Sequence, residues 1–121
     1  MKLLVVDDLE AVGVIVAEIA SQSGWQSIHC TQADQIVETI QKEKIDVVLM
    51  DYFMPGKSGL DVATMVRDAG LKTTIIFFSG MASQIDRSKA DELGIFKILD
   101  KPLSIKELRK SLTEAQASIE R

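Results

Sequence analysis

The sequence contains very few of the residues that cross-link proteins or bind soft metal ions. Among its 121 residues are a single cysteine, Cys30, and a single histidine, His29. One cysteine cannot form an intrachain disulfide, and a free thiol is typical of a reducing compartment, so we expect a cytoplasmic protein. No cluster of several cysteines or carboxylates, which could bind a metal ion together with His29, lies near it in the sequence. We therefore assign His29 a structural or exposed position and no metal-binding or catalytic role.

The chain also lacks a basic surplus and a long hydrophobic run. It has 14 lysines and arginines against 18 acidic residues, with an isoelectric point near 4.9. This balance argues against direct, sequence-independent binding to DNA or RNA. The apolar start, residues 1–6, is too short for a signal or membrane helix. With 46% hydrophobic and 26% charged residues, the composition indicates a globular protein, and we expect one domain over residues 1–121.

The apolar pattern predicts five strands that alternate with five helices. We expect strands over residues 1–6, 25–30, 45–51, 73–78 and 95–99. We expect helices over residues 9–23, 32–43, 59–69 and 83–93, and a last helix with Ser104 as its N-cap. Such alternation is typical of an α/β fold in which right-handed crossovers place helices on both faces of a parallel sheet.

The first predicted helix is more apolar than a single buried face requires. Val12, Ile15, Val16 and Ile19 are spaced to form its buried stripe, and Val14 falls on the opposite side. The additional apolar residues indicate either a docking surface or a helix that packs against two neighbours.

Polar side chains follow four of the five predicted strands at their carboxyl ends. They are Asp7 and Asp8 after the first strand, Asp51 at the end of the third, Ser79 after the fourth and Lys101 after the fifth. Each alone is explained as a residue that starts a loop. Because the carboxyl ends of parallel strands share one edge, where ligands of open α/β sheets bind, their joint placement indicates a functional site.

The residue types at this edge favour phosphate chemistry. Clustered carboxylates repel one another unless a cation lies between them, and all-oxygen ligation favours Mg²⁺ over Ca²⁺, for which no EF-hand spacing is present. Lys101 offers a positive charge and Ser79 a hydroxyl to phosphoryl oxygens. Asp51, central among the acids, is then a candidate nucleophile that forms an aspartyl phosphate.

These motifs resemble the receiver domains of two-component response regulators over essentially the whole chain. The resemblance rests on Val6-Asp7-Asp8, on Asp51 followed by Met54-Pro55-Gly56 and Ser58-Gly59-Leu60-Asp61, on Ser79-Gly80 and on Lys101-Pro102. It implies a flavodoxin-like (βα)5 fold with strand order 2-1-3-4-5. It also implies that a sensor histidine kinase or a histidine phosphotransfer protein phosphorylates Asp51.

The resemblance further implies a role for each residue at the strand ends. Lys101 would contact the phosphoryl group, Ser79 would move to hydrogen-bond it, and the Lys101–Pro102 peptide would be cis. The implied Mg²⁺ ligands are Asp7, Asp8, Asp51 and the backbone carbonyl of Phe53.

Two departures from the family pattern affect what we expect of this chain. Ile98 stands three residues before Lys101, where receivers usually have the aromatic residue that switches position on activation; Phe96 is a possible substitute. Phe53 and Met81 stand where some relatives have polar residues that help orient water. We therefore expect the acyl phosphate of this protein to hydrolyse more slowly than that of receivers with polar residues at these two positions.

Three other readings compete with a phosphorylated receiver. A haloacid-dehalogenase-like phosphatase would have a second aspartate two residues after Asp51, where Phe53 stands. In a flavin-binding flavodoxin, Asp7 and Asp8 would repel the flavin phosphate. A receiver-fold interaction module that has lost phosphorylation stays open as an alternative.

The expected output is a change in binding to a partner protein. No effector domain fits after Leu112, so the partner would carry the response. We expect no enzymatic activity beyond the protein's own phosphorylation and dephosphorylation, and a monomer or a weak, phosphorylation-dependent dimer.

Overall fold

A parallel five-stranded sheet forms the centre of the molecule. The computed structural model describes all residues, 1–121. The strands are β1 (Lys2–Val6), β2 (Gln26–Cys30), β3 (Val47–Asp51), β6 (Thr74–Ser79) and β7 (Lys97–Asp100). They are arranged in the order β2-β1-β3-β6-β7. Counted along this sheet alone, the order is 2-1-3-4-5, which confirms the predicted flavodoxin-like fold.

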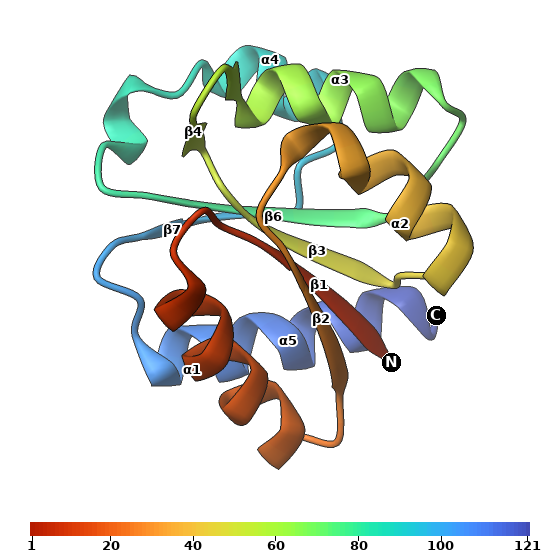
Figure 1. Cartoon of the computed structure of the whole chain (residues 1–121), viewed down its shortest axis with the longest axis vertical. Helices are drawn as coiled ribbons and strands as arrows, with labels where there is room; N and C mark the ends of the chain where they lie inside the picture. Colours follow the sequence, from red (N-terminus) through yellow and green to blue (C-terminus); the bar gives the residue numbers. More distant parts are fainter.

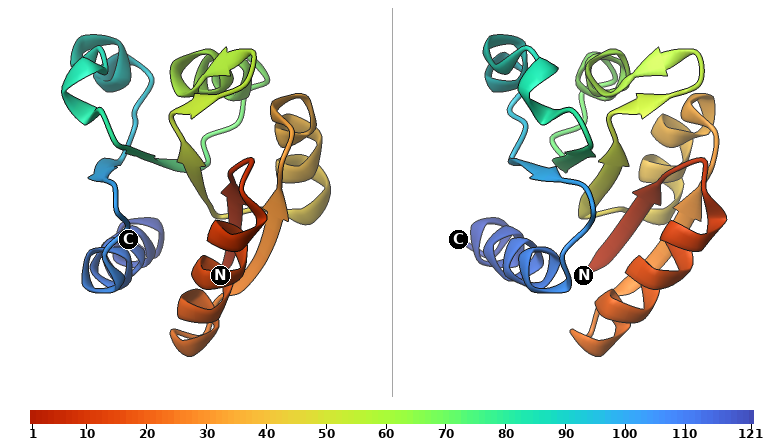
Figure 2. Two further views of the ribbon diagram at one scale, coloured as in Figure 1. Left: turned by 60° about the vertical axis from the view of Figure 1, so that its left-hand side comes forward. Right: turned by 90° about the vertical axis from the view of Figure 1, so that its left-hand side faces the viewer.

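Helices cover both faces of the sheet, as Figures 1 and 2 show. On one face lie α2 (Ile36–Glu43), α3 (Gly59–Asp68) and α4 (Arg87–Glu92). On the other lie α1 (Glu10–Gln22) and α5 (Ile105–Ile119). The sheet is thus the middle of three layers, and the predicted alternation of strands and helices is confirmed.

Each strand supplies side chains to two separate cores. Successive side chains of a strand point to opposite faces, so both faces must be apolar when helices cover both. Buried on the α2–α4 side are Leu4, Val6, Val48, Met50, Ile75 and Phe77. Buried on the α1–α5 side are Leu3, Val5, Val47, Leu49, Ile76 and Phe78. Full burial of one such side chain contributes about 1.5–3 kcal/mol, so the strand ends are held on a rigid base.

Local side-chain chemistry sets where the helices begin. The Ser104 hydroxyl accepts a hydrogen bond from the Glu107 N–H at 3.2 Å, which confirms the predicted N-cap of α5. Ser58 and Asp61 form a reciprocal capping box at the start of α3. The Lys101–Pro102 peptide is cis, as the resemblance implied.

Two predicted helices are shorter than the pattern indicated. The helix expected over residues 83–93 is divided into a 3₁₀ turn, η2 (Ala82–Gln84), and α4. Ile85 is buried in an extended conformation between them, and the Asp86 carboxylate caps α4 by accepting from the Lys89 N–H at 3.1 Å. The helix expected from residue 32 similarly starts as a 3₁₀ turn, η1 (Ala33–Gln35).

A short hairpin, which the sequence did not predict, follows the central strand. Its strands β4 (Phe53–Met54) and β5 (Lys57–Ser58) pair antiparallel, separate from the main sheet. The turn between them contains Gly56 with φ of +84°, a conformation that glycine adopts without strain.

The buried face of α1 differs from the predicted stripe. Val16 and Ile19 are buried as expected, but the Ile15 assignment was wrong, because this side chain is 55% exposed. Val14 is 63% exposed, so the surplus apolar residues lie on the surface rather than against a second neighbour. Ile105 of α5 is likewise exposed. No helix of the protein has both the length and the hydropathy needed to cross a membrane.

Candidate functional site

The strand register brings the polar residues at the carboxyl ends of the strands to one edge of the sheet. Val6 of β1 is in register with Met50 of β3, so Asp7 and Asp51 follow in neighbouring positions. Asp51 is in register with Phe78 of β6, just before Ser79, and Ser79 is in register with Asp100 of β7, just before Lys101. The structure therefore places all five predicted residues at one edge of the sheet, with the three aspartates clustered and Lys101 paired to Asp51.

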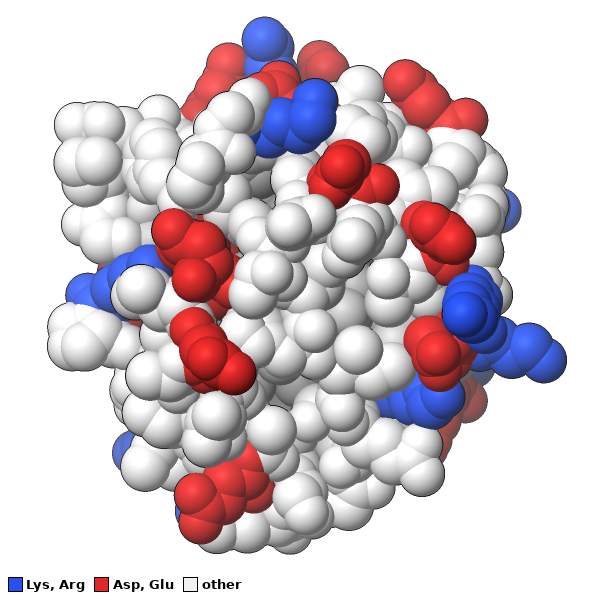
Figure 3. All heavy atoms as spheres, viewed as in Figure 1, with Lys and Arg blue, Asp and Glu red and all other residues white.

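Three carboxylates form the acidic part of this site. Oxygen atoms of Asp7, Asp8 and Asp51 all lie within 4.8 Å of one another. Asp7 is fully buried, Asp51 is nearly so, and Asp8 is exposed. Figure 3 shows acidic atoms on the surface where the chain turns from β1 into α1. The cluster thus has a buried base and an opening to solvent.

The Asp7 carboxylate is only half satisfied by the protein. Its Oδ1 accepts a hydrogen bond from the Leu9 N–H at 2.7 Å, but its buried Oδ2 has no hydrogen-bond partner. Burial raises the pKa of Asp7 above its ordinary value, and the nearby Asp51 charge raises it further, against the lowering effect of the Leu9 N–H. A buried acceptor left unpaired beside other acids is the environment that a bound cation stabilises.

Asp51 is paired with Lys101. The Lys101 Nζ donates to Asp51 Oδ2 at 3.0 Å, and the Phe53 N–H donates to Asp51 Oδ1 at 3.2 Å. The Lys101 side chain is 33% exposed, and its Nζ lies 5.0 Å from the centre of the Phe78 ring. Its backbone N–H donates to the Ser79 carbonyl at 3.0 Å, which fixes the end of β7 beside β6.

Ser79 is fully buried at the end of β6. Its hydroxyl oxygen accepts a hydrogen bond from the Met81 N–H at 2.9 Å. This contact ties the start of the loop after β6 to the site, so a movement of the Ser79 hydroxyl would release that loop.

The donor atoms of this site fit a hard divalent cation. All three clustered side chains offer oxygen, and the Asp7 carboxylate among them has one buried oxygen without a hydrogen-bond partner. Oxygen donors of this kind are the preferred ligands of Mg²⁺ and Ca²⁺. The carbonyl of Phe53 remains a predicted ligand.

Exposed apolar side chains flank the acidic cluster. Phe53 is 45% exposed, with its ring edge-to-face against Tyr52 at 4.9 Å between centroids, and Met81 is 48% exposed. Phe53 has no polar side-chain atom, and the thioether sulfur of Met81 is only a weak acceptor, so both orient water poorly. Ile98 packs against the core on the α2–α4 side, whereas Phe96 packs against the opposite core, so Phe96 does not take the place that Ile98 occupies.

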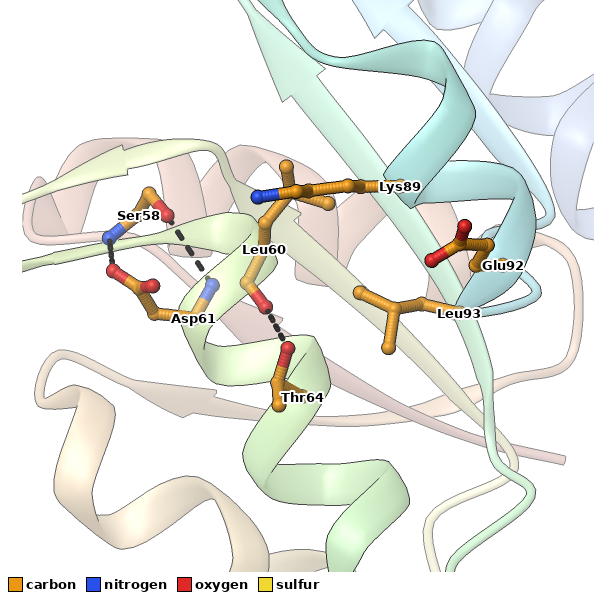
Figure 4. Close-up of a pocket in the computed structure, with 7 residues that line it drawn as sticks. All are labelled: Ser58, Leu60, Asp61, Thr64, Lys89, Glu92 and Leu93. Carbon is orange, nitrogen blue, oxygen red and sulfur yellow. Dashed lines mark hydrogen bonds between the residues drawn. The ribbon is translucent and has the colours of Figure 1, made fainter.

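A separate hollow lies between α3 and α4. It has a volume of about 460 Å³, and Figure 4 shows the residues that line it. Its polar groups on the α3 side serve that helix: Ser58 and Asp61 cap α3, and the Thr64 hydroxyl donates to the Leu60 carbonyl. These groups are thus already bonded within α3, whereas the acidic cluster at the strand ends has an unpaired carboxylate oxygen.

Sequence reasoning missed one residue beside this site. His29, to which the sequence assigned no function, has its Nε2 2.9 Å from the backbone oxygen of Asp7. The only signal in the sequence was its place one residue before the end of a strand that neighbours β1.

Comparison with known proteins gives relatives that are regulators or phosphotransferases. The transcriptional regulatory protein DltR of Streptococcus agalactiae is 32% identical over 121 residues, covering 98% of this chain and 54% of the relative. The sporulation initiation phosphotransferase F of Bacillus subtilis is 28% identical over 92% of this chain and 90% of its own length. The chain spans about half the length of the transcriptional regulatory proteins it matches, such as DltR and the CpxR protein of Escherichia coli.

Solved structures share the fold at low sequence identity. A response regulator receiver domain protein (CheY-like) from Methanospirillum hungatei has a TM-score of 0.89 at 20% identity, covering 98% of this chain and 95% of the other. A response regulator receiver domain protein from Clostridium thermocellum has a TM-score of 0.88 at 21% identity, with 98% and 96% coverage.

The family model of the response regulator receiver domain matches residues 3–113, nearly the whole chain. This match agrees with the sheet order and with the acidic cluster beside a lysine. The chain belongs to the response regulator receiver domain family, the signalling modules of two-component systems.

Proposed function

We propose that this receiver accepts a phosphoryl group on Asp51 from a sensor histidine kinase or a histidine phosphotransfer protein, and that phosphorylation changes its binding to a partner protein. The observation that carries this proposal is the contact between Lys101 Nζ and Asp51 Oδ2 beside the unpaired, buried Oδ2 of Asp7. The arrangement provides a nucleophile, a positive charge and a set of oxygen donors for a cation.

Asp51 would act as the nucleophile in this reaction. A carboxylate oxygen of Asp51 attacks the phosphorus atom of a phosphohistidine, and the new O–P bond forms as the N–P bond breaks. The electron pair of the broken bond stays on the histidine nitrogen. Asp7, Asp8, Asp51 and the Phe53 carbonyl would hold Mg²⁺, which supplies positive charge to the transferring phosphoryl oxygens when it is bound.

Lys101 and Ser79 would stabilise the product. Lys101 is within hydrogen-bonding distance of Asp51, so a small movement of its flexible side chain carries the charge to a phosphoryl oxygen. The Ser79 hydroxyl would turn from the Met81 N–H toward the phosphoryl group. That turn would free the loop that leads into η2 and α4, which is a route from the phosphoryl group to the surface.

We further propose a protein output, in the cytoplasm that the single free cysteine favours. Binding to a downstream protein and relay of the phosphoryl group to a second histidine protein are both compatible with the site. The phosphotransferase of Bacillus subtilis is matched over 90% of its own length, which favours relay. The transcriptional regulatory relatives match over about half of theirs, so their role in transcription is not carried over.

The test is labelling by acetyl phosphate with Mg²⁺, measured by intact mass. We expect the wild-type protein to be labelled, Asp51→Asn to be unlabelled, and Asp68→Asn, an exposed aspartate at the end of α3, to match the wild type. Full labelling of Asp51→Asn would place the nucleophile elsewhere. Absence of label on the wild-type protein would instead support an interaction module that has lost phosphorylation.

A further inference from the structure

Strand β2 holds both polar backbone groups of Asp7. The Asp7 N–H donates to the Cys30 carbonyl at 3.2 Å, and His29 Nε2 lies 2.9 Å from the Asp7 carbonyl oxygen. A carbonyl oxygen can only accept, so this contact requires the hydrogen of His29 on Nε2. Two neighbouring residues of β2 therefore fix the end of β1 at the point where the acidic cluster begins.

The contact needs space that α1 provides. A Cβ atom at Gly13 would lie 2.4 Å from Nδ1, 2.6 Å from Cγ and 2.7 Å from Cε1 of His29, closer than real atoms approach. Gly13 is buried in the first half of α1, where glycine is a poor helix former compared with alanine. The ring thus occupies the position of the missing side chain, and it lines a hollow of about 270 Å³ between α1 and β2.

The Asp7 carbonyl belongs to the peptide that joins Asp7 to Asp8. With its N–H and carbonyl both bonded to β2, Asp7 has little freedom to rotate on either side of its Cα. The direction of this peptide sets the position of the Asp8 Cα, from which the exposed Asp8 side chain extends. A contact with the Asp7 carbonyl therefore acts on two of the three clustered carboxylates at once.

We propose that His29 is a positioning residue for the acidic site: its Nε2–H holds the Asp7–Asp8 peptide, and Gly13 makes room for its ring. The inference rests on the proposed function, because the positioned carboxylates are those that would hold Mg²⁺. Mg²⁺ demands near-ideal octahedral geometry, so a change in the direction of this peptide weakens binding even when all the acids remain.

The first test is Mg²⁺ affinity, measured by calorimetry without any phosphodonor. We expect His29→Phe, which keeps a ring but removes the donor, to weaken Mg²⁺ binding about tenfold, the lower end of what loss of a ligand-orienting group costs. His29→Gln, whose amide can donate, should recover most of the affinity. Ser27→Ala, on the same strand but away from Asp7, should bind Mg²⁺ as the wild type does.

The second test examines the contact itself in the metal-free protein. Nitrogen NMR of wild-type His29 should show the hydrogen on Nε2. Gly13→Ala should lower the midpoint of thermal unfolding in the wild-type background, because the new Cβ meets the ring. The same substitution should raise the midpoint in a His29→Ala background, where only the better helix propensity of alanine remains.

The outcomes separate this inference from the function on which it rests. A wild-type protein that binds Mg²⁺ together with a His29→Phe variant of equal affinity would overturn the positioning role alone. A hydrogen found on Nδ1 of wild-type His29 with none on Nε2 would overturn it as well, and so would a Gly13→Ala effect of equal sign in both backgrounds. A wild-type protein that does not bind Mg²⁺ would overturn both the positioning role and the proposed function.

Discussion

At the scale of one residue, the buried charge of Asp7 lowers the stability of the metal-free protein. Burial raises its pKa above the ordinary value of 3.8, so folding favours the protonated form. A carboxyl group of this kind stabilises the folded state at low pH and loses that contribution as the pH rises through its folded pKa. At neutral pH the ionised Asp7 carboxylate therefore lowers the free energy of unfolding of the metal-free protein.

The corresponding prediction concerns Asp7→Asn in the presence of a chelator. Removing the charge should raise the midpoint of thermal unfolding at pH 7, and the gain should shrink toward pH 3, where the wild-type carboxyl is protonated. The same variant should lose the added stability that Mg²⁺ confers on the wild-type protein. A lower midpoint at pH 7 without metal would contradict the assigned role of the Asp7 charge.

Phe53 and Met81 lead to a prediction about the lifetime of the phosphorylated state. Both side chains are about half exposed, on residues whose backbone N–H groups bond to Asp51 and Ser79, and neither has a strong hydrogen-bonding group for the attacking water. We expect Phe53→Asn and Met81→Glu each to shorten the lifetime of the acyl phosphate, because the new polar side chain can hydrogen-bond to a water molecule. Decay of the labelled protein, followed by mass, measures this. Unchanged or longer lifetimes would refute the expectation.

At the scale of the elements, one arginine joins three segments at the end of the molecule away from the acidic site. The Arg67 guanidinium of α3 donates to the carbonyls of Leu71, Thr73 and Leu93 at 2.7–2.9 Å. Burial lowers the pKa of Arg67, and no carboxylate pairs with it. It thus connects the end of α3 to the start of β6 and the end of α4.

We expect Arg67→Met to lower the free energy of unfolding by about 3 kcal/mol, since three hydrogen bonds to a charged donor are lost and each is worth about 1 kcal/mol or more. Chemical denaturation measures the loss. Arg87→Met, at an exposed arginine of α4, is the matched control and should change stability little. Equal losses in the free energy of unfolding for the two substitutions would show that the Arg67 contacts do not stabilise the fold more than an exposed arginine does.

Elements with strong local signals could be predicted from the sequence. The β-branched and aliphatic run before Asp51 predicted the central strand, and Ser104 predicted the start of α5. The 3₁₀ turns η1 and η2 could not be predicted, because apolar spacing does not distinguish a continuous helix from a turn, an extended residue such as Ile85 and a new cap at Asp86. Ile15 was misplaced because its spacing fits the buried stripe, and only tertiary packing leaves it exposed.

The candidate site was predictable for a topological reason. The carboxyl ends of parallel strands lie at one edge of the sheet. A small error in the predicted strand ends therefore still leaves the polar residues that follow them at that edge. The contact of His29 with Asp7 was not predictable in this way. It depends on the register between β1 and β2 and on a ring placed over Gly13, neither of which a local pattern encodes.

At the scale of the whole molecule, a cation bound only by the folded state should stabilise the entire domain. A Mg²⁺ concentration one hundred times its dissociation constant should raise the free energy of unfolding by about 2.7 kcal/mol. Thermal unfolding of the wild-type protein with Mg²⁺ or with a chelator measures this. Asp8→Asn, which leaves the buried Asp7 in place, should respond much less, and an equal response would remove Asp8 from the site.

The phosphorylated state should also differ from the resting state in what it binds. Beryllofluoride, which mimics a phosphoryl group on an aspartate, allows the two states to be compared in a pull-down. We expect a partner that is retained with beryllofluoride and Mg²⁺ and lost from Asp51→Asn under the same conditions. Identical partners in both states would remove phosphorylation as the control of the output.

The central claim is that Asp51, among three clustered aspartates, receives the phosphoryl group. Borohydride reduces an acyl phosphate to an alcohol, so phosphorylated aspartate becomes homoserine, which peptide mass spectrometry locates. After treatment with acetyl phosphate and Mg²⁺, we expect homoserine at position 51 and nowhere else. Homoserine at position 7 or 8, with an unreduced aspartate at position 51, would contradict the account.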